Sequence, residues 1–307
     1  MSTIKKVTYD NGTYEGEFND DGFRHGRGKY VWNDGNRYDG DWLSGHRTGY
    51  GTFIWSNGGT YVGQWLNEDR SGFGTHFYSD GAKYEGEWEK NLRHGKGVCY
   101  YLNGDKYDGE WSSDKKHGKG EYLWTCGDRY EGDWLDDSRT GNGRYFWANG
   151  DKYVGQWISG EVTGVGVYYY HDGTVHAGTF VKASPNGMGR REYTNGDRYE
   201  GEWQNGKKHG YGTYTWANGD KYSGDWVDDT RTGKGVLVWA NGEVYDGSWI
   251  GGKKHGYGTY TWANGDKYEG DWVEDARTGE GVYTFADGTV QKGTFIDGQL
   301  QNVRSKT

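Results

Sequence analysis

Apolar and polar residues alternate along this chain in short runs that recur every 23 residues. In the segment 199–203, Tyr-Glu-Gly-Glu-Trp, aromatic residues and glycine occupy every second position and charged residues stand between them. The same parity returns in 210–216. Alternation with period two is typical of a strand with one covered face. Each recurrence therefore predicts two strands that pair as an antiparallel hairpin, and Asn218-Gly219 predicts a tight turn into the next repeat.

A tyrosine opens most of the repeats, namely Tyr38, Tyr61, Tyr84, Tyr107, Tyr130, Tyr153, Tyr199, Tyr222, Tyr245 and Tyr268. Tyr14 opens a repeat of 24 residues, His176 stands at one opening, and Gln291 begins an incomplete repeat. A fixed short period indicates one structural element stacked many times. We therefore expect an all-β fold: an elongated, single-layer, twisted antiparallel sheet made of tandem 23-residue hairpins.

The repeat also divides the chain. We expect a capping strand in 1–13, a first block of seven repeats in 14–175, an atypical repeat in 176–198, a second block in 199–295 and a tail in 296–307. The outermost strands are expected at 3–9 and 291–296. Because end strands carry unpaired backbone groups, they predict a homodimer formed through the terminal repeats.

All 17 tryptophans fall at two positions of the repeat. Ten of them close the first strand and form a structural ladder: Trp42, Trp65, Trp88, Trp111, Trp134, Trp157, Trp203, Trp226, Trp249 and Trp272. The glycines share this face of the strands. A residue without a side chain lets a ring from a neighbouring strand lie flat on the backbone. The sequence thus predicts that rings and glycine sockets interlock on one face, while the acidic residues between them keep the other face soluble.

Composition sets limits on this picture. Apolar residues make up 32% of the chain and aromatic residues 18%, so the core must be a thin aromatic layer. The net charge of −9 disfavours nucleic acid as a partner. No apolar run approaches the roughly 18 residues of a membrane span, and the first residues lack a secretory signal. Two cysteines at different repeat positions predict no disulfide framework. We expect a cytoplasmic protein that is not secreted.

The motifs Tyr-Glu-Gly-Glu-Trp, His-Gly-x-Gly and Asn-Gly-Asp-x-Tyr resemble the MORN (membrane occupation and recognition nexus) repeat. The resemblance covers residues 14–295 in thirteen copies. It implies hairpins in a twisted single-layer sheet that acts as a non-catalytic scaffold in cytoskeletal structures, cilia and membrane–cytoskeleton junctions. Some members of this family carry catalytic domains, for which this chain has no room.

A basic residue recurs after the first strand of most repeats, and we call this set the basic row: Arg47, Arg70, Arg93, Lys116, Arg139, Lys208, Arg231, Lys254 and Arg277. Arg24 is its equivalent in the 24-residue repeat. We expect the row in the loop that joins the two strands of each hairpin, stacked along one edge of the sheet. One interpretation is a comb of cations that binds an acidic filament, a protein partner or phosphoinositide head groups.

The other interpretation is local pairing within the loop. Asp136-Asp137 precede Arg139 and would neutralise it, and Asp228-Asp229 do the same for Arg231. The loops with Lys208 and Lys254 contain no acidic residue. Both interpretations stay open from the sequence.

The repeat at 176–198 departs from the pattern. His176 and Phe180 replace the tyrosine and tryptophan, Pro185 is the only proline, and Arg191 stands at an inward aromatic position. The segment 172–180 closely matches 287–295, so a repeat that ends the array also occurs in mid-chain. These departures predict a kink or altered twist at 176–198, with ordinary drift of one repeat as the alternative.

The sequence contains no catalytic motif outside the repeat positions, and the histidines lack the cysteine partners of a zinc site. We expect no catalytic residue, metal or cofactor. The predicted function is a non-catalytic scaffold for protein–protein interaction and self-association, with cytoskeletal or ciliary proteins as partners and a location at the cytoskeleton or membrane. The alternative is a peripheral module that binds anionic phospholipid or phosphoinositide through the basic row.

Overall fold

The computed structural model describes residues 4–303, which form 27 β-strands and no helix. The chain divides into two compact units. The first runs to Asn149 and includes Trp157–Gly160, and the second comprises Gly150–Gln156 and continues from Glu161. The predicted end strand and tail extend into 1–3 and 304–307, which lie outside the described residues.

The strands of the repeats are alternately seven and nine residues long. The first unit contains β1 (Lys5–Tyr9), β2 (Gly12–Phe18), β3 (Arg24–Trp32), β4 (Arg37–Leu43), β5 (His46–Ile54), β6 (Thr60–Leu66), β7 (Asp69–Phe77), β8 (Lys83–Glu89), β9 (Leu92–Tyr100), β10 (Lys106–Ser112), β11 (Lys115–Leu123), β12 (Arg129–Leu135) and β13 (Ser138–Phe146). Residues of β14 (Lys152–Ile158) fall in both units. The second unit contains β15 (Glu161–Tyr169), β16 (Val175–Val181), β17 (Ser184–Glu192), β18 (Arg198–Gln204), β19 (Lys207–Thr215), β20 (Lys221–Val227), β21 (Thr230–Val238), β22 (Val244–Ile250), β23 (Lys253–Thr261), β24 (Lys267–Val273), β25 (Ala276–Thr284), β26 (Val290–Ile296) and β27 (Gln299–Val303).

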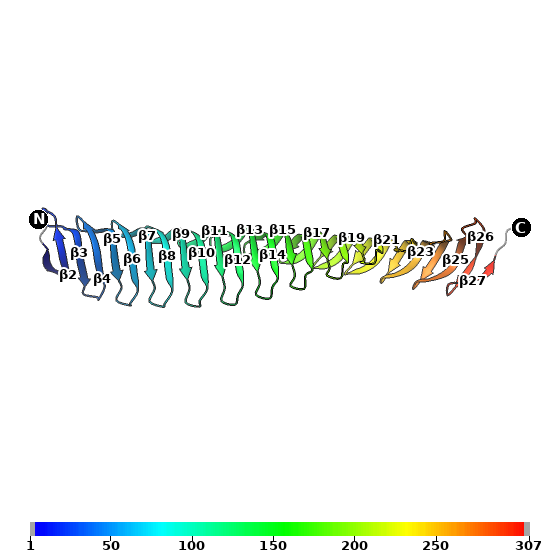
Figure 1. The fold of residues 1–307 in the computed structure, drawn as a ribbon, viewed down its shortest axis with the longest axis horizontal. Coiled ribbons are helices and arrows are strands. Elements are labelled where there is room, and N and C mark those ends of the chain that lie inside the picture. Colours follow the sequence, from blue (N-terminus) through cyan, green and yellow to red (C-terminus); the bar gives the residue numbers. More distant parts are fainter. Residues whose placement is uncertain (1–3, 304–307) are drawn as a thin grey trace. The chain divides into compact units, whose positions relative to one another are not determined.

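Within each unit, strands that follow one another in the sequence lie side by side in one layer (Figure 1). From β1 to β13, each strand pairs antiparallel with the next. From β15 to β27 the pairing is the same. The predicted all-β class, an antiparallel sheet of tandem hairpins, is confirmed.

The two kinds of turn differ from the expectation. Strands β18 and β19 are joined by Asn205-Gly206, a two-residue turn in which φ is 50° and 81°. Such a turn matches the twist of a hairpin and favours Asn-Gly. The turn at Asn218-Gly219 exists but belongs to a wider loop, in which the Trp216 N–H donates to the Asp220 carbonyl. The tight turn therefore lies inside each repeat, and the wider loop joins one repeat to the next.

A bulge interrupts each of these hairpins after the first paired glycine. In β18 and β19, Gly201 faces Gly212, but the next residue, Glu202, faces His209. The Glu202 carboxylate accepts a hydrogen bond of 3.2 Å from the Tyr211 N–H within the bulge. The acidic residue at this position therefore closes the bulge. From the sequence, these acidic residues were expected only to keep the outer face of the sheet soluble.

The core is a layer of rings seated on paired glycines. Tyr199 is fully buried, and its hydroxyl donates to the Glu202 carbonyl at 3.0 Å. A Cβ atom on Gly212 would lie 2.1 Å from that hydroxyl, so only glycine leaves room for the ring. The Trp226 indole N–H donates to the Gly212 carbonyl at 3.1 Å and ties the next repeat to the same socket.

The two unusual segments of the second unit keep the sheet pairing. In the atypical repeat, His176 faces Arg191 and Phe180 faces Pro185 across β16 and β17. The predicted kink stays a prediction.

The C-terminal end strand was predicted at the wrong place. Strand β27 pairs with β26, so 291–296 is an inner strand. Part of the segment predicted as a tail is therefore a strand. Its Gln-Leu-Gln sequence carries no repeat signature.

Candidate functional site

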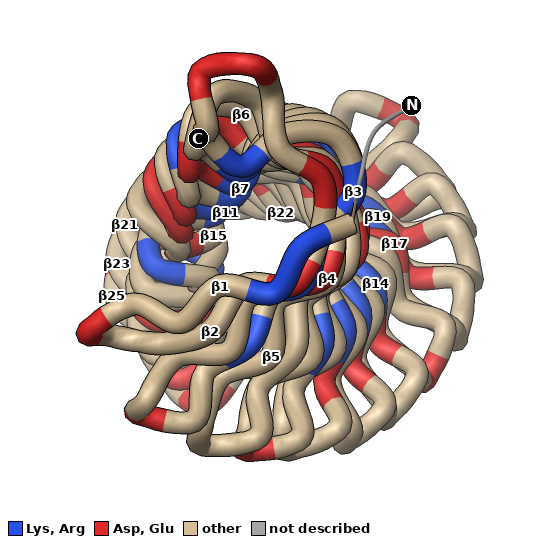
Figure 2. The backbone as a smooth tube through the Cα atoms, turned by 90° about the vertical axis from the view of Figure 1, so that its left-hand side faces the viewer, with Lys and Arg blue, Asp and Glu red and all other residues tan. Residues whose placement is uncertain are grey.

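The basic row lies in strands, not in loops. Arg47 belongs to β5, and it faces Trp42 of β4 across the hairpin. Because Trp42 points into the aromatic layer, its cross-strand partner points there too. The expected loop position was wrong because the turn takes only two residues and the strand resumes directly after it. Figure 2 shows basic residues along the strands and acidic residues both along the strands and at loops.

Each cation of the row lies over the aromatic ring that closes the first strand of the following repeat, which is an indole except at Arg277, where it is Phe295. The Arg47 guanidinium carbon is 4.6 Å from the centre of the Trp65 ring, and that of Arg93 is 4.1 Å from Trp111. The lysines sit slightly farther away, with Lys254 Nζ 4.8 Å from Trp272. A partly desolvated contact of this kind contributes about 1–2 kcal/mol. The row and the tryptophan ladder are therefore one interlocked structure.

A carboxylate from the following repeat neutralises several of these cations. It comes from the second residue of the next two-residue turn. Glu68 accepts from both the backbone N–H of Arg47, at 2.7 Å, and its Nε, at 2.6 Å. Arg93 Nε lies 2.9 Å from Asp114 in the same way. Lys208 Nζ lies 3.3 Å from Asp229.

Four arginines have a glycine at that turn position instead. Arg24, Arg139, Arg231 and Arg277 each donate from Nη2 to a glycine carbonyl, at 2.7, 2.7, 2.8 and 2.6 Å respectively. The glycines are Gly45, Gly160, Gly252 and Gly298. The described residues place no carboxylate within ion-pair distance of these four guanidinium groups.

This arrangement corrects the expected local pairing. Asp137 was predicted to neutralise Arg139, but it accepts the backbone N–H of Lys116 at 3.0 Å, in the preceding repeat. Asp229 likewise serves Lys208 and not Arg231. The predicted pairing of these aspartates with the arginines of their own repeat was wrong, because each turn packs against a strand of the repeat before it. Whether the row binds a ligand stays a prediction.

The pKa values of two arginines of the basic row differ according to whether a carboxylate lies beside them. Burial lowers the pKa of the Arg231 guanidinium, which has no carboxylate beside it. Burial also opposes the charge on Arg93, but the hydrogen bond to Asp114, together with the charges of Tyr78, Asp114 and Cys99, raises the pKa of that guanidinium. The Arg231 charge therefore lacks the compensation that Asp114 gives to Arg93.

The atypical repeat replaces the missing cation from another position. Pro185 occupies the place of the basic row and supplies no charge. Arg191 extends from the inward aromatic position of β17, and its guanidinium carbon lies 4.3 Å from the Trp203 ring centre. His176 is fully buried between Phe180 and Trp203, and neither ring nitrogen has a hydrogen-bond partner. Burial lowers the pKa of His176 to about 3, so the ring is neutral in the folded chain.

The face opposite the aromatic layer exposes apolar side chains in consecutive repeats. Val165, Met188 and Tyr211 occupy one repeat position in β15, β17 and β19, and they are 63%, 61% and 59% exposed. They face polar residues across the strands, for example Tyr211 and Asp225. We call these three residues the outer apolar row. The sequence analysis did not find it, although three apolar residues at a spacing of 23 were a readable signal.

Other kinds of site find little support. Among residues 4–303, no three His, Cys, Asp or Glu side chains are grouped so that they could hold a metal ion. The described part of the chain contains no helix that could cross a membrane.

Comparisons with known proteins agree with the repeat architecture. The MORN repeat family model matches twelve tandem segments that together span residues 14–290. The thirteenth copy expected from Gln291 is not matched. No curated protein matches the chain.

Several solved structures match at low TM-score. The TCP domain of SAS-4 (dCPAP) from Drosophila melanogaster, in complex with a proline-rich motif of Ana2, is 18% identical, with 58% of this chain and 85% of that chain covered and a TM-score of 0.30. The TCP10 domain of Danio rerio CPAP with a STIL peptide is 10% identical, with 87% and 98% covered and a TM-score of 0.24. Virginiamycin B lyase from Staphylococcus aureus is 12% identical, with 96% and 89% covered and a TM-score of 0.14. Likenesses this low carry no conclusion about function.

Proposed function

Since the chain belongs to the MORN-repeat family, we propose that it is a non-catalytic repeat scaffold that binds proteins and associates with itself. Its place is a cytoskeletal or ciliary structure or a membrane–cytoskeleton junction. The observation that carries this proposal is the outer apolar row. Three exposed apolar side chains recur at one repeat position on one face of the sheet, and exposed apolar surface rimmed by polar residues is typical of protein interaction sites.

The spacing of the outer apolar row suits a protein partner. Successive repeats add two strands, so Val165, Met188 and Tyr211 follow one another at about 10 Å. A strand or helix edge from another chain can contact all three at once, and each buried side chain contributes about 1.5–3 kcal/mol. The flanking acidic residues, such as Glu202 and Asp225, give the row a polar rim.

The alternative function, binding of anionic phospholipid, draws its support from the basic row. Against it, Arg47, Arg93 and Lys208 already pair with carboxylates of this chain, and the net charge is −9. A membrane surface needs clusters of free cations that reach it together. Protein binding is therefore the function that we favour.

Sedimentation velocity across a concentration series tests the proposal. The wild-type chain is expected to form dimers or larger species, and the double variant Met188→Glu/Tyr211→Glu to stay monomeric. Both side chains are exposed, so the variant should keep its fold. Asn142→Glu, which adds one such charge at the same repeat position in another repeat, is the control and should behave as wild type.

Vesicles of phosphatidylcholine with a phosphoinositide form the second arm of this test. A wild-type chain that stays monomeric at all concentrations but sediments with these vesicles in a salt-sensitive way would favour the lipid function and reject the scaffold.

A further inference from the structure

Among the described residues, Arg24 is the arginine without a carboxylate partner that lies nearest to β1. Its surroundings have the geometry of a carboxylate site that the chain itself does not fill. In the next repeat, Glu68 fills this site by accepting from the backbone N–H and from Nε of Arg47. The carbonyl of Arg47 accepts the Glu68 N–H, and the carbonyl of Arg24 accepts the Gly45 N–H in the same way. Since the N–H and C=O of one strand residue point to the same side, the Arg24 N–H also faces this turn.

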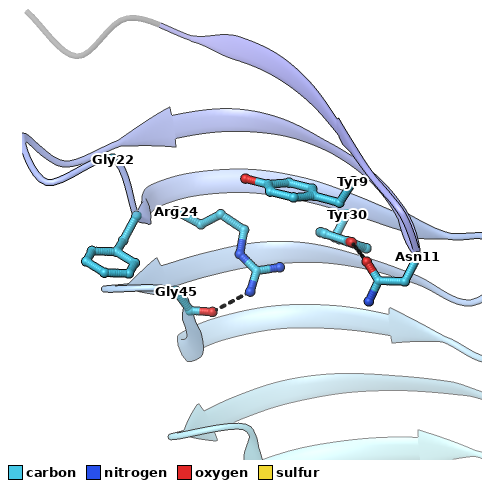
Figure 3. A pocket seen from close by; sticks show the side chains of 7 residues that line it. Tyr9, Asn11, Gly22, Arg24, Tyr30 and Gly45 are labelled. Atoms are coloured by element: carbon cyan, nitrogen blue, oxygen red, sulfur yellow. Dashed lines mark hydrogen bonds between the residues drawn. The ribbon is translucent and has the colours of Figure 1, made fainter.

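Gly45 has no side chain that could accept hydrogen bonds from the Arg24 backbone N–H and Nε. Arg24 donates only Nη2, to the Gly45 carbonyl at 2.7 Å (Figure 3). The described residues provide no side-chain acceptor for its backbone N–H or for Nε. The guanidinium carbon lies 4.4 Å from the Trp42 ring centre, so the indole holds the charge in place. Two parallel donors, one of them charged, match the two oxygens of a carboxylate.

The surroundings form a pocket around this charge. Tyr9, Asn11, Phe23, Arg24 and Tyr30 line a hollow of about 380 Å³ together with the glycines of two turns (Figure 3). The longer turn of the 24-residue repeat, closed by Asn19, leaves the Phe23 ring 55% exposed. Tyr9 is 40% exposed and stacks 6.2 Å from Tyr30. The Arg24 guanidinium at the base of the hollow can bind an acidic side chain. The accessible rings of Phe23 and Tyr9 can contact the apolar atoms next to that side chain.

We propose that Arg24, with its backbone N–H, binds the carboxylate of an aspartate or glutamate on a protein partner, and that Phe23 and Tyr9 hold the neighbouring atoms of that partner. The same opening recurs in the second unit at Arg231 and Arg277. These two lie two repeats apart, about 19 Å across four strands. The second turn residue of the following repeat thereby decides whether a cation is closed by the chain or open to a partner.

The occupant is a carboxylate because the chain itself places one in this position in neighbouring repeats. Glu68, Asp114, Asp137 and Asp229 each accept the backbone N–H of the residue equivalent to Arg24. The inference rests on the proposed function in one respect only, that the carboxylate belongs to a protein. It uses the aromatic face, and the proposed self-association uses the outer apolar row.

The test follows backbone amide NMR signals of the full chain during titration with sodium N-acetylglutamate at constant ionic strength. The Arg24 amide is expected to shift and saturate, and the Arg47 amide to stay unchanged because Glu68 already occupies it. Sodium phosphate is titrated in parallel as the comparison anion, because arginine also binds phosphate through two parallel donors.

Turn variants make the test specific. Gly45→Asp supplies an internal carboxylate and should abolish the Arg24 response. Aspartate fits this backbone, because Asp114 and Asp229 both have a φ of 68° at the equivalent position. Gly45→Ala is the matched control: it adds a Cβ without charge, as Ala183 does at a φ of 63°, and should keep the response. Glu68→Gly should give the Arg47 amide a response that wild type lacks.

Several results would overturn the inference. They are an Arg24 amide that does not respond to N-acetylglutamate, a response to phosphate alone, a response that survives Gly45→Asp, or a response only to phosphatidylserine vesicles. The double variant Met188→Glu/Tyr211→Glu should leave the titration unchanged. A chain that fails to self-associate but passes this titration would reject the scaffold proposal and retain the carboxylate site.

Discussion

The glycine sockets make the sharpest prediction about stability. Gly59 and Gly63 stand four residues apart, on either side of the boundary between two repeats, and neither has a positive φ. A Cβ atom on Gly63 would lie 2.4 Å from the Gly74 Cα and 2.6 Å from the Tyr61 hydroxyl. On Gly59 the nearest atom would be the Asn57 Oδ1, at 3.3 Å, which belongs to a side chain that can move.

The cost of Gly63→Ala follows from what must shift. The two strands cannot stay in register with a Cβ between them, and overpacking of this kind costs about 1–3 kcal/mol. The Tyr61 side chain must also move away from its position over the paired glycines. It loses the hydrogen bond to the Gln64 carbonyl, 3.0 Å long, and its edge contacts with Trp65 and Trp88, 5.2 and 5.5 Å between ring centres. These losses bring the expected destabilisation to about 3–5 kcal/mol.

Gly59→Ala should change the free energy of unfolding by less than about 1 kcal/mol, since alanine restricts the unfolded chain and fits the folded one. The chain already has Ala82 at the equivalent position of the next repeat. Urea denaturation followed by tryptophan fluorescence compares the two variants. Hydrogen exchange of the amides in β6 and β7 shows whether any loss is local, as expected in a repeat array. Equal stability of the two variants would refute the account of the sockets.

Three further predictions concern single side chains. His176 has a pKa of about 3 when folded against 6.5 when unfolded; the unfolded state takes up the proton first, so stability is lost as the pH falls below 6.5. Between pH 7 and pH 5 this loss is about 2 kcal/mol, and urea midpoints should show a smaller loss for His176→Tyr; equal losses would contradict the buried neutral ring. Arg191→Leu removes the cation over Trp203 and should cost about 1 kcal/mol, measured by thermal melting, whereas an unchanged melting temperature would show that the stacking is not stabilising. Tyr222→Phe loses the hydrogen bond to the Asp225 carbonyl and should cost about 1 kcal/mol by urea denaturation; a stabilised variant would rule that bond out.

The alternation of residues was enough to predict the strands, their hairpin pairing and the seating of rings on glycines. The direction of the basic row depended on where the turn ends. The row was expected in a loop, where alternation does not apply, but the turn has only two residues and β19 begins at Lys207. Counted back from Gly212, alternation places Lys208 on the inward face, and the structure pairs it with the inward Trp203.

The partner of each cation was hidden for a different reason. Asp229 lies next to Arg231 in the sequence but contacts Lys208, 21 residues earlier. Only the stacking of one hairpin on the previous one brings these residues together. The glycines at Gly252 and Gly298, which leave their arginines open, look like ordinary turn residues until that stacking is known.

Proximity labelling in the source cell tests the central claim, that this chain is a scaffold acting through its exposed repeat surfaces. The wild-type chain is compared with Met188→Glu/Tyr211→Glu, with Asn142→Glu as the control. We predict enrichment of cytoskeletal or ciliary proteins around the wild-type chain and the control, and loss of that set around the double variant. An identical set around all three chains, or no protein enriched around the wild type, would contradict the account.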